Sequence, residues 1–571
     1  MITTSVPEYE IEHLVHAMVP MRDGIRLSTD LFIPKGNANH SGPWPVLLTR
    51  TPYGNSDAQR AERLLYFARR GFACAFQDCR GRYDSEGEWE PFRSERNDGM
   101  DTIAWLAAQD FCNGSVGVTG GSYEGYCTWV VAYDRHPALK AICPIVPLPD
   151  PVINVPYQNG ALFWNMVVWA LMVHGRVNQN TGVANWKDLF LHLPLRTLDK
   201  AAGMESATWQ NWCDHPALDD WWKEVCYMDK LGRVDIPALH ICGWYDDDGI
   251  STYINYPKMR REAATAEARD AQMLVIGPWP HKVNVSSVVG EVDFGAGAVI
   301  DLNAIRLKFF AKYLAGEDHG LGGEPRCRIF LMGENRWHGF DDWPPTGAET
   351  KRLYLSSGGN ANSLFGDGKL TTEAQRQGDV DAADCDLFTY DPANPVPYVT
   401  DPVALQLGEA TDQQSIERRP DVLVYTTAPL EEDVVICGRV FAELYISTDV
   451  PATDFTAKLV DVWPNGRAIQ LCDGIQRAEF RNSLESPEWL EPGKVYKVVV
   501  DMWATGIRFL RGHSIRLEVS SSAVPKFCRH LNTKEPQADA TDWQVAHQVV
   551  WHTSEYPSAV VVEVVKPDVA D

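Results

Sequence analysis

Three residues of this sequence have the types and the chain order that nucleophilic catalysis at a carbonyl group requires: Ser122, Asp246 and His281. Each follows a short apolar run of strand length, and catalytic residues of open α/β sheets lie in loops at the carboxyl ends of strands. In such a triad the histidine takes the serine proton and returns it to the leaving group, while the carboxylate orients the imidazole. The order Ser, Asp, His therefore predicts Ser122 as the nucleophile, Asp246 as the orienting acid and His281 as the base.

The glycines around Ser122 predict a tight turn between a strand and a helix. An apolar run at residues 116–119 leads into the sequence GGSYEG at residues 120–125. A serine on such a turn exposes its hydroxyl, and the N–H of the next residue, Tyr123, points at the developing oxyanion. The usual pattern is G-x-S-x-G, but here Glu124 takes the place of the second glycine, which follows at Gly125. Taken alone, the run also fits a glycine-rich turn of a Rossmann-like sheet, although the fingerprint G-x-G-x-x-G is not present at this turn.

Other roles remain open for some neighbouring side chains. The acidic run of Asp246, Asp247 and Asp248 could bind a cation, because carboxylates suit hard metals, but no second cluster of ligands accompanies it. Three further histidines could act as the base, and none follows a strand end after the acid: His136, His174 and His513. His240 falls inside a predicted strand, where we expect it to pack.

The elements that must position these residues are visible as an alternation of apolar runs and helical stretches. Strands are predicted at residues 44–49, 73–77, 116–119 and 141–144, and again at 236–243 and 273–277. Helical spacing of apolar residues occurs at 59–69 and 98–108, and a further helix is predicted at 302–314. Short continuous apolar strands that alternate with helices predict a buried, largely parallel sheet. The pair Asp23-Gly24 between two alternating runs predicts a hairpin before it.

The pattern changes twice along the chain and predicts three parts. Residues 1–146 and 234–345 form an α/β core, and residues 147–233, rich in proline and tryptophan, form a helical insertion. Residues 346–571 contain alternating or β-branched runs separated by Gly, Pro and Asp, which is typical of an all-β sandwich.

Composition narrows the class of protein. A chain of 571 residues is too long for a single hydrophobic core. The formal net charge of −25 argues against a nucleic-acid partner, because phosphate binding needs clustered Lys and Arg. The 13 cysteines are scattered singly, which indicates free thiols in a reducing cytoplasm. The start of the sequence lacks the pattern of a signal peptide, and no apolar run has the length of a membrane span. We therefore expect a cytoplasmic protein with a small-molecule partner, no metal and no cofactor; homo-oligomerisation stays open.

With these residues in view, the sequence resembles the bacterial cocaine esterase family, which is grouped with X-prolyl dipeptidyl peptidases and α-amino acid ester hydrolases. The resemblance covers nearly the whole length and rests on several motifs: Met21-Arg-Asp-Gly, Arg50-Thr-Pro-Tyr53, Gln77-Asp-Cys-Arg-Gly81 with Ser85-Glu-Gly87, residues 121–125, Gly243-Trp-Tyr-Asp246, Gly277-Pro-Trp-Pro-His281, residues 453–461 and Asp473-Gly474. It implies an α/β-hydrolase core, a helical cap inserted after the strand at 141–144, and a C-terminal jelly-roll. It also implies that G-x-S-Y-x-G is this family's version of the serine turn.

The resemblance further implies an oxyanion hole made by the Tyr53 hydroxyl and the Tyr123 backbone N–H. A phenol donor at the end of the predicted strand 44–49 is able to stabilise a tetrahedral oxyanion, an effect typically worth about 3 kcal/mol. As an alternative, Tyr53 is a turn residue that simply follows Pro52.

Substrate preference is predicted from the same comparison. In the amino acid ester hydrolases, acidic residues beside the triad hold a free amino group. Asp248 lies near one such position, but Gly249 occupies the next, and no further carboxylate follows Asp150 at residues 151–156. We therefore expect no preference for a free α-amine. Four cap aromatics suggest an apolar or aromatic acyl group, with packing as the alternative role for each: Tyr157, Phe163, Trp164 and Trp169.

The sequence thus predicts a serine hydrolase that cleaves a small or medium ester through an acyl-enzyme. Amide or peptide cleavage by the same triad is the first alternative. A second is an acyltransferase or synthase that uses an alcohol or amine acceptor in place of water, as in natural-product metabolism. A third, suggested by the jelly-roll, is a non-catalytic carbohydrate-binding protein.

Overall fold

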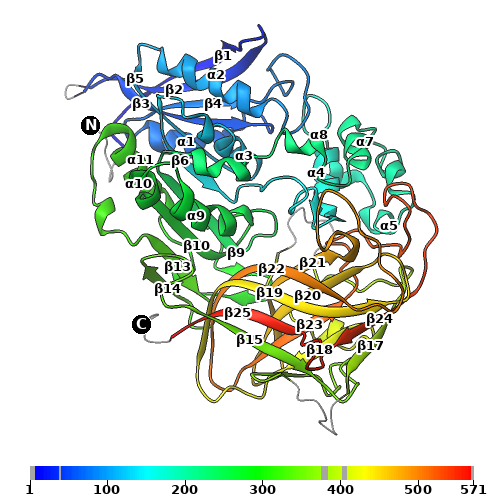
Figure 1. Cartoon of the computed structure of the whole chain (residues 1–571). Coiled ribbons are helices and arrows are strands. Elements are labelled where there is room, and N and C mark those ends of the chain that lie inside the picture. The colour runs from blue at the N-terminus through cyan, green and yellow to red at the C-terminus, as the bar shows by residue number, and fades with distance from the viewer. Residues whose placement is uncertain (1–6, 38–39, 375–382, 401–407, 567–571) are drawn as a thin grey trace.

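Two large β-sheets organise the chain, one in each half of the sequence (Figure 1). The computed structural model describes residues 7–37, 40–374, 383–400 and 408–566. The first sheet has ten strands in the order β1-β2-β4-β3-β5-β6-β9-β10-β13-β14. Its strands are β1 (Ile11–Pro20), β2 (Arg26–Pro34), β3 (Trp44–Thr51), β4 (Ala73–Asp78), β5 (Cys112–Gly121), β6 (Leu139–Ile145), β9 (Ala238–Tyr245), β10 (Gln272–Pro280), β13 (Cys327–Leu331) and β14 (Arg336–Phe340).

The strands of this sheet that lead to the candidate catalytic residues run parallel. β3 pairs in parallel with β4 and β5, β5 with β6, β6 with β9, and β9 with β10. β1 and β2 form the antiparallel hairpin that Asp23-Gly24 predicted. The predicted parallel sheet is therefore confirmed, and its carboxyl ends place the loops after β3, β5, β9 and β10 at one edge.

Alternation of side chains along each strand decides which helices cover which face. On β3, Val46 and Leu48 pack on the face covered by α2 and α3, whereas Leu47 packs on the face covered by α1 and α11. The helices around the sheet are α1 (Ala58–Ala68), α2 (Glu95–Ala107), α3 (Tyr123–Trp129), α9 (Ser251–Glu262), α10 (Ala266–Asp270) and α11 (Leu302–Phe310). Because β3 is buried along its whole length, the sheet forms a rigid base for the loops at its edge.

The segment between β6 and β9, which we call the cap, consists of short helices, as the sequence predicted. Its elements are β7 (Tyr157–Gln158), β8 (Ala161–Leu162), α4 (Trp164–Met172), α5 (Trp186–Leu189), α6 (Leu198–Ala201), α7 (Ala207–Asp214) and α8 (Asp220–Lys223). In Figure 1 the cap lies beside the core and above the second sheet. Side-chain caps begin two of its helices: Ser206 accepts from the Trp209 N–H, and Asp219 accepts from the Trp222 N–H.

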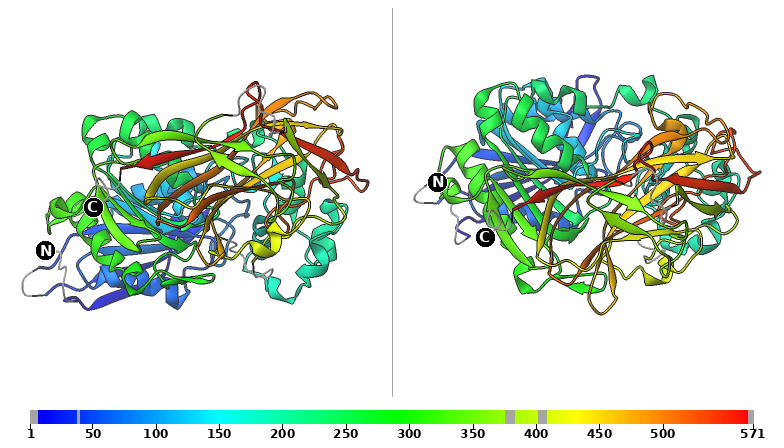
Figure 2. Two further views of the ribbon diagram at one scale, coloured as in Figure 1. Left: turned by 90° about the horizontal axis from the view of Figure 1, so that it is seen from below. Right: turned by 60° about the horizontal axis from the view of Figure 1, so that its bottom comes forward.

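The part of the chain from β15 onward, which we call the β-domain, is built on an eleven-stranded sheet, and its described residues include the short helix α12 (Gln414–Glu417). In the left view of Figure 2, seen from below, the strands of this sheet lie in front of and beside the core. Its strands are β15 (Glu349–Ser356), β16 (Lys369–Thr371), β17 (Cys385–Tyr390), β18 (Leu423–Thr426), β19 (Val434–Thr448), β20 (Asp454–Val462), β21 (Ala468–Arg477), β22 (Tyr496–Phe509), β23 (Ser514–Ser520), β24 (Ala546–Trp551) and β25 (Ala559–Val565).

Strand β21 shows why some strands escaped prediction. It is buried along its whole length, yet it carries polar residues such as Asp473 and Arg477. These charges are neutralised by ion pairs with Lys526 and Asp454, at 2.8 and 2.9 Å. Long-range pairs of this kind allow a buried strand that has no apolar alternation.

The β-domain contacts both other parts of the chain. The Trp164 N–H of the cap donates to the carbonyl of Lys526 at 2.9 Å, and the Phe163 ring packs against Phe527. On the core side, the Tyr245 hydroxyl donates to the carbonyl of Gln470 at 3.1 Å. The cap and the loop after β9 are therefore both held in place by contacts with the β-domain. Within the described ranges, no helix combines the length and the apolar character that crossing a membrane requires.

Candidate active site

Ser122 stands at the junction of β5 and α3 in a conformation that L-residues rarely adopt, with φ 61° and ψ −127°. Its N–H donates to the carbonyl of Ile145 at 3.0 Å, and its own carbonyl accepts from the N–H groups of Gly125 and Tyr126. Strained backbone of this kind persists only where the surroundings enforce it, and it clusters at functional sites. The sharp turn predicted for GGSYEG is therefore present.

The glycines of this turn are required by close packing. A Cβ atom at Gly120 would lie 2.4 Å from the Glu124 Cβ, and one at Gly125 would lie 2.9 Å from the Cα of Pro147. The collision at Gly125 explains the displaced glycine of the motif, since it is the position that passes closest to the chain after β6. Glu124 has room at the usual glycine position because its side chain turns toward Arg60, with a contact of 3.0 Å.

The loops after β9 and β10 bring the predicted acid and base together. His281 Nδ1 donates to Asp246 Oδ1 at 2.8 Å in the tautomer that leaves Nε2 free to accept a proton. A Cβ at Gly243 would lie 2.0 Å from the carbonyl oxygen of Trp279, and one at Gly249 would lie 1.8 Å from Asp246 Oδ2. Gly249 therefore leaves the space that the Asp246 carboxylate occupies, which accounts for the missing side chain at that position.

A second carboxylate lies against the same imidazole nitrogen. Asp248 Oδ1 is 2.6 Å from His281 Nδ1. The oxygen lies off the N–H direction, and it has no hydrogen-bond partner among the described residues. Burial raises the pKa of Asp248 to about 6. Burial alone lowers the pKa of His281, but Asp248 and Asp246 together raise it well above its usual value.

Tyr53 lies beside Ser122, where the loop after β3 reaches the sheet edge. Its hydroxyl oxygen accepts a hydrogen bond from Trp169 Nε1 at 3.0 Å, and the side chain of Ser122 lies next to it. Burial raises the pKa of Tyr53, so the phenol keeps its proton. Because Trp169 already occupies an acceptor site of the oxygen, the Tyr53 hydrogen is left to donate.

The side chain of Tyr123 anchors the backbone N–H that follows Ser122. The hydroxyl donates to Glu95 Oε1 at 3.0 Å and accepts from the Phe92 N–H at 2.6 Å. Arg50 lies 2.7 Å from Glu95 Oε2 and neutralises that buried carboxylate. The motif residue Arg50 therefore stabilises the turn indirectly, because it pairs with Glu95, which in turn binds the Tyr123 hydroxyl.

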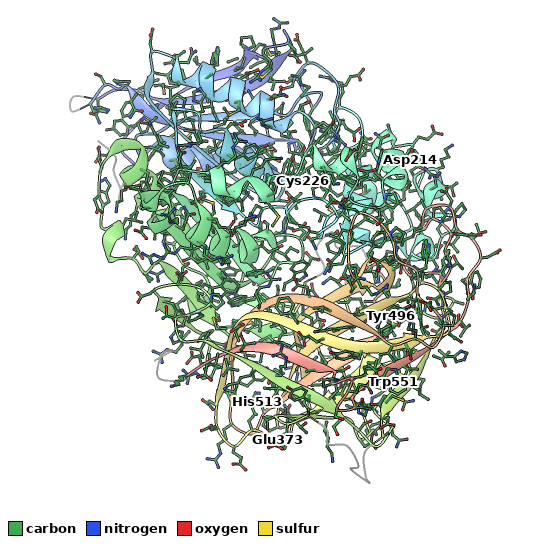
Figure 3. All side chains as sticks on the ribbon, viewed as in Figure 1. Asp214, Cys226, Glu373, Tyr496, His513 and Trp551 are labelled. Carbon is green, nitrogen blue, oxygen red and sulfur yellow. The ribbon has the colours of Figure 1, made fainter. Side chains whose placement is uncertain are left out.

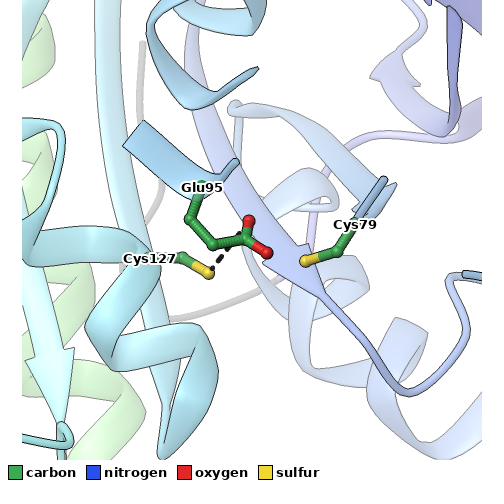
Figure 4. Close-up of side chains that lie close together, drawn as sticks. All are labelled: Cys79, Glu95 and Cys127. Atoms are coloured by element: carbon green, nitrogen blue, oxygen red, sulfur yellow. Dashed lines mark hydrogen bonds between the residues drawn. The ribbon is translucent and has the colours of Figure 1, made fainter. Parts of the chain in front are cut away.

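Two sets of three potential metal ligands occur in the described part of the chain, and each already has protein partners. The first joins Cys79 after β4, Glu95 of α2 and Cys127 of α3 (Figure 4), and Cys127 Sγ donates to Glu95 Oε2 at 3.6 Å. Arg50 supplies the positive charge at this cluster. The second set consists of Asp246, Asp248 and His281, the group that is described above.

Residues that sequence reasoning missed connect the turn to the Tyr53 loop. Arg60 stacks over the Tyr53 ring at 4.5 Å and pairs with Glu124 Oε1 at 3.0 Å. The only signal in the sequence was a glutamate in the motif where glycine is usual. Its partner on α1 could not be identified from spacing.

The four cap aromatics occupy different surroundings. Trp169 is next to the site, since it bonds Tyr53 and its ring stacks on Tyr123 at 5.5 Å. The Tyr157 hydroxyl donates to the carbonyl of Trp212 at 2.7 Å. Phe163 packs on Phe527 of the β-domain, and Trp164 packs on Trp186 and Phe190 within the cap.

The other histidines have structural partners or lie elsewhere. His513 belongs to the β-domain, as Figure 3 shows, and its Nδ1 is 2.8 Å from Asp461. His240 is buried in β9 between Trp129 and Tyr256, and it hydrogen-bonds to Gln272 at 2.9 Å. His136 Nδ1 accepts from the Ala138 N–H at 3.2 Å. Burial lowers the pKa of His174, which follows α4 in the cap.

Comparison with known proteins agrees with this arrangement. The X-Pro dipeptidyl-peptidase (S15 family) matches residues 23–283, and the X-Pro dipeptidyl-peptidase C-terminal non-catalytic domain matches residues 319–561. A cocaine esterase from Rhodococcus sp. (strain MB1 Bresler) is 35% identical over 96% of this chain and 98% of that protein.

Two solved structures resemble the whole chain. An aminopeptidase from a marine sediment archaeon, Thaumarchaeota archaeon, has a TM-score of 0.85 and 27% identity over 99% of this chain and 98% of its own. An α-amino acid ester hydrolase has a TM-score of 0.82 and 27% identity over the same shares. The predicted α/β-hydrolase core with a C-terminal all-β domain is thereby confirmed. The chain belongs to the cocaine esterase and X-Pro dipeptidyl-peptidase (S15) family, and it is a serine hydrolase.

Proposed function

We propose that this enzyme hydrolyses small or medium esters with an apolar or aromatic acyl group, through an acyl-enzyme on Ser122. The observation that carries the proposal is the contact of Tyr53 with both Ser122 and Trp169, since it joins a nucleophile, an oxyanion donor and a cap aromatic. The paired His281 and Asp246 supply the base and its orienting acid.

Each step uses groups whose positions are described above. His281 Nε2 takes the Ser122 proton while Oγ bonds to the substrate carbonyl carbon. The Tyr53 hydroxyl and the Tyr123 N–H donate to the oxyanion that forms. His281 then gives its proton to the leaving oxygen, and Asp246 stabilises the imidazolium throughout. Water activated by His281 releases the acid by the reverse sequence.

The cap supports an apolar acyl group. The Trp169 ring stacks with Tyr123 and with Trp212, so an aromatic surface adjoins the Tyr53 hydroxyl. We propose Trp169 as the cap residue that contacts the acyl group, with Tyr157, Phe163 and Trp164 shaping the wall behind it. The relative named cocaine esterase is consistent with this substrate class.

Amide or peptide cleavage is the second candidate, because the aminopeptidase structure and the S15 match favour it. An amine leaving group needs the same proton from His281. Recognition of a free α-amine would need a carboxylate at the acyl site. Asp248, the nearest candidate by sequence, instead lies at His281 Nδ1. Acyl transfer to an alcohol or amine remains a further alternative, and product analysis with and without an added acceptor distinguishes it.

A labelling experiment tests the nucleophile. Wild type should react with a fluorophosphonate, and Ser122→Ala should not. Ser115→Ala, at the opposite end of β5, removes a serine from the same strand and should label like wild type. Failure of the wild type to label, or labelling of Ser122→Ala, would refute the assignment.

A substrate panel tests the bond and the acyl group. p-Nitrophenyl esters with acetyl, butyryl and benzoyl groups should be cleaved, and aminoacyl anilides should be poor substrates. Faster cleavage of the anilides than of the esters would favour the peptidase instead.

We also propose that the enzyme works in the cytoplasm and that the domains follow the predicted boundaries. All 13 cysteines are free thiols, which suits a reducing compartment. The proposed core covers residues 1–146 and 234–345, the cap 147–233 and the jelly-roll 346–571. Sedimentation of the purified protein would determine whether it forms a homo-oligomer.

A further inference from the structure

The loop after β9 presents two carboxylates to one imidazole nitrogen. Asp246 Oδ1 is 2.8 Å and Asp248 Oδ1 is 2.6 Å from His281 Nδ1. The two side chains come from the same short turn, in which the Asp248 N–H approaches Asp246 Oδ1 at 3.5 Å. A triad needs one carboxylate at this nitrogen, so the second requires its own explanation.

We propose that Asp248 is a positioning residue that holds His281 jointly with Asp246 and strengthens the imidazole as a proton acceptor from Ser122. This inference rests on the proposed role of His281 as the base. Asp248 acts through the imidazole, because it lies at Nδ1, whereas the proton of Ser122 arrives at Nε2.

The geometry of the two carboxylates assigns a different role to each. Asp246 accepts the Nδ1 hydrogen bond and so fixes the tautomer and the ring plane. Asp248 is off the N–H direction, so its effect on the ring is electrostatic. Both carboxylates are buried, and an opposite charge at such a distance acts strongly where water is excluded. The imidazolium that forms during acylation is therefore stabilised by two charges.

The same geometry restricts the protonation states of the group. Two ionised carboxylates at this spacing favour the protonated imidazole, and together they raise the pKa of His281 well above its usual value. While the His281 imidazole is protonated it cannot act as a base, so its loss of that proton sets the acidic limb of activity. Because Asp248 and His281 are in direct contact, these two groups titrate together. Asp246 and Asp248 are the charged side chains with the largest effects on His281, and the Cys242 thiol contacts Asp246 Oδ2 at 3.6 Å from behind.

Asp247 offers a matched control in the same run. It lines a small cavity between the core and the β-domain, and Asp248 and His281 do not line that cavity. Asp247→Asn therefore removes one charge from the same turn on the side that faces β21. Asp248→Glu keeps the charge at the proposed position and serves as the conservative variant.

The test is the pH dependence of kcat/KM for p-nitrophenyl acetate in wild type, Asp248→Asn, Asp248→Glu and Asp247→Asn. In Asp248→Asn the acidic limb should move to lower pH by about one unit, and the plateau should fall about tenfold. The limb should stay near the wild-type position in Asp248→Glu and Asp247→Asn. An unmoved limb in Asp248→Asn, or an equal shift in Asp247→Asn, would overturn the proposal.

NMR titration of the His281 ring provides a second readout that does not need turnover. Its pKa should fall in Asp248→Asn, and an unchanged value would also overturn the proposal. His281→Ala separates the two levels of inference. If that variant keeps wild-type turnover, the proposed catalytic role of His281 fails. If it is inactive while Asp248→Asn titrates like wild type, only the role of Asp248 fails.

Discussion

Trp169, on the cap helix α4, donates its indole N–H to the Tyr53 hydroxyl oxygen at 3.0 Å. This hydrogen bond connects the cap with the loop after β3, which lies in the core. Because it occupies one acceptor site of the oxygen, it leaves the Tyr53 hydrogen available to donate, which ties the cap to the proposed oxyanion donor.

Trp169→Phe should lower kcat about fivefold, because it removes a neutral hydrogen bond worth about 1 kcal/mol while keeping an aromatic ring. Trp164→Phe makes the same change on a ring that packs within the cap. Steady-state kinetics with p-nitrophenyl butyrate should show a larger loss of kcat in Trp169→Phe. Equal losses in the two variants would mean that the bond to Tyr53 has no special effect.

Tyr53→Phe should lower kcat about 100-fold, since loss of one oxyanion donor typically costs about 3 kcal/mol. The ring remains, so the stacking of Arg60 should persist and the protein should fold normally. Single-turnover acylation measures the effect directly. Tyr66→Phe, on the neighbouring helix α1, is the control and should acylate at the wild-type rate. Wild-type acylation by Tyr53→Phe would contradict its assignment as a donor.

The free energy of unfolding should be higher for Ser122→Gly than for Ser122→Ala, by about 1 kcal/mol or more. Both variants lack the hydroxyl, but only glycine relieves the φ of 61° at this position. Urea unfolding of the two inactive proteins provides the comparison. If the alanine variant proved as stable as the glycine variant, backbone strain at Ser122 would be refuted.

The free energy of unfolding of Glu518→Gln, relative to that of the wild type, should increase as the pH rises. Burial raises the pKa of Glu518 to about 8 despite the nearby Lys458, so the folded protein holds a proton that the unfolded chain releases near pH 4.5. Wild-type stability therefore falls as the pH increases between these two values, and glutamine removes that contribution. The difference in free energy of unfolding between variant and wild type should be larger at about pH 9 than at about pH 5. A difference that does not vary with pH would show that Glu518 titrates normally.

Local sequence patterns were sufficient to predict the strands that position the candidate catalytic residues. The strands β3, β5, β9 and β10 could be predicted because each is a short apolar run that is followed by a turn. Their parallel pairing brings their carboxyl ends to one edge of the sheet. The order of Ser122, Asp246 and His281 after these strands then predicted their roles as nucleophile, acid and base. The resemblance supplied Tyr53 and the unusual glycine spacing, which the packing of Gly125 against Pro147 explains.

Only the tertiary structure decided which neighbours act on these residues. Asp247 and Asp248 are adjacent and chemically identical, yet one faces a cavity and the other faces His281, since the turn after β9 sets their directions. The pairing of Glu124 with Arg60 likewise depends on how α1 packs beside α3. Sequence patterns fix periodicity and order along one element, whereas these contacts join side chains from separate elements and depend on the folded backbone between them.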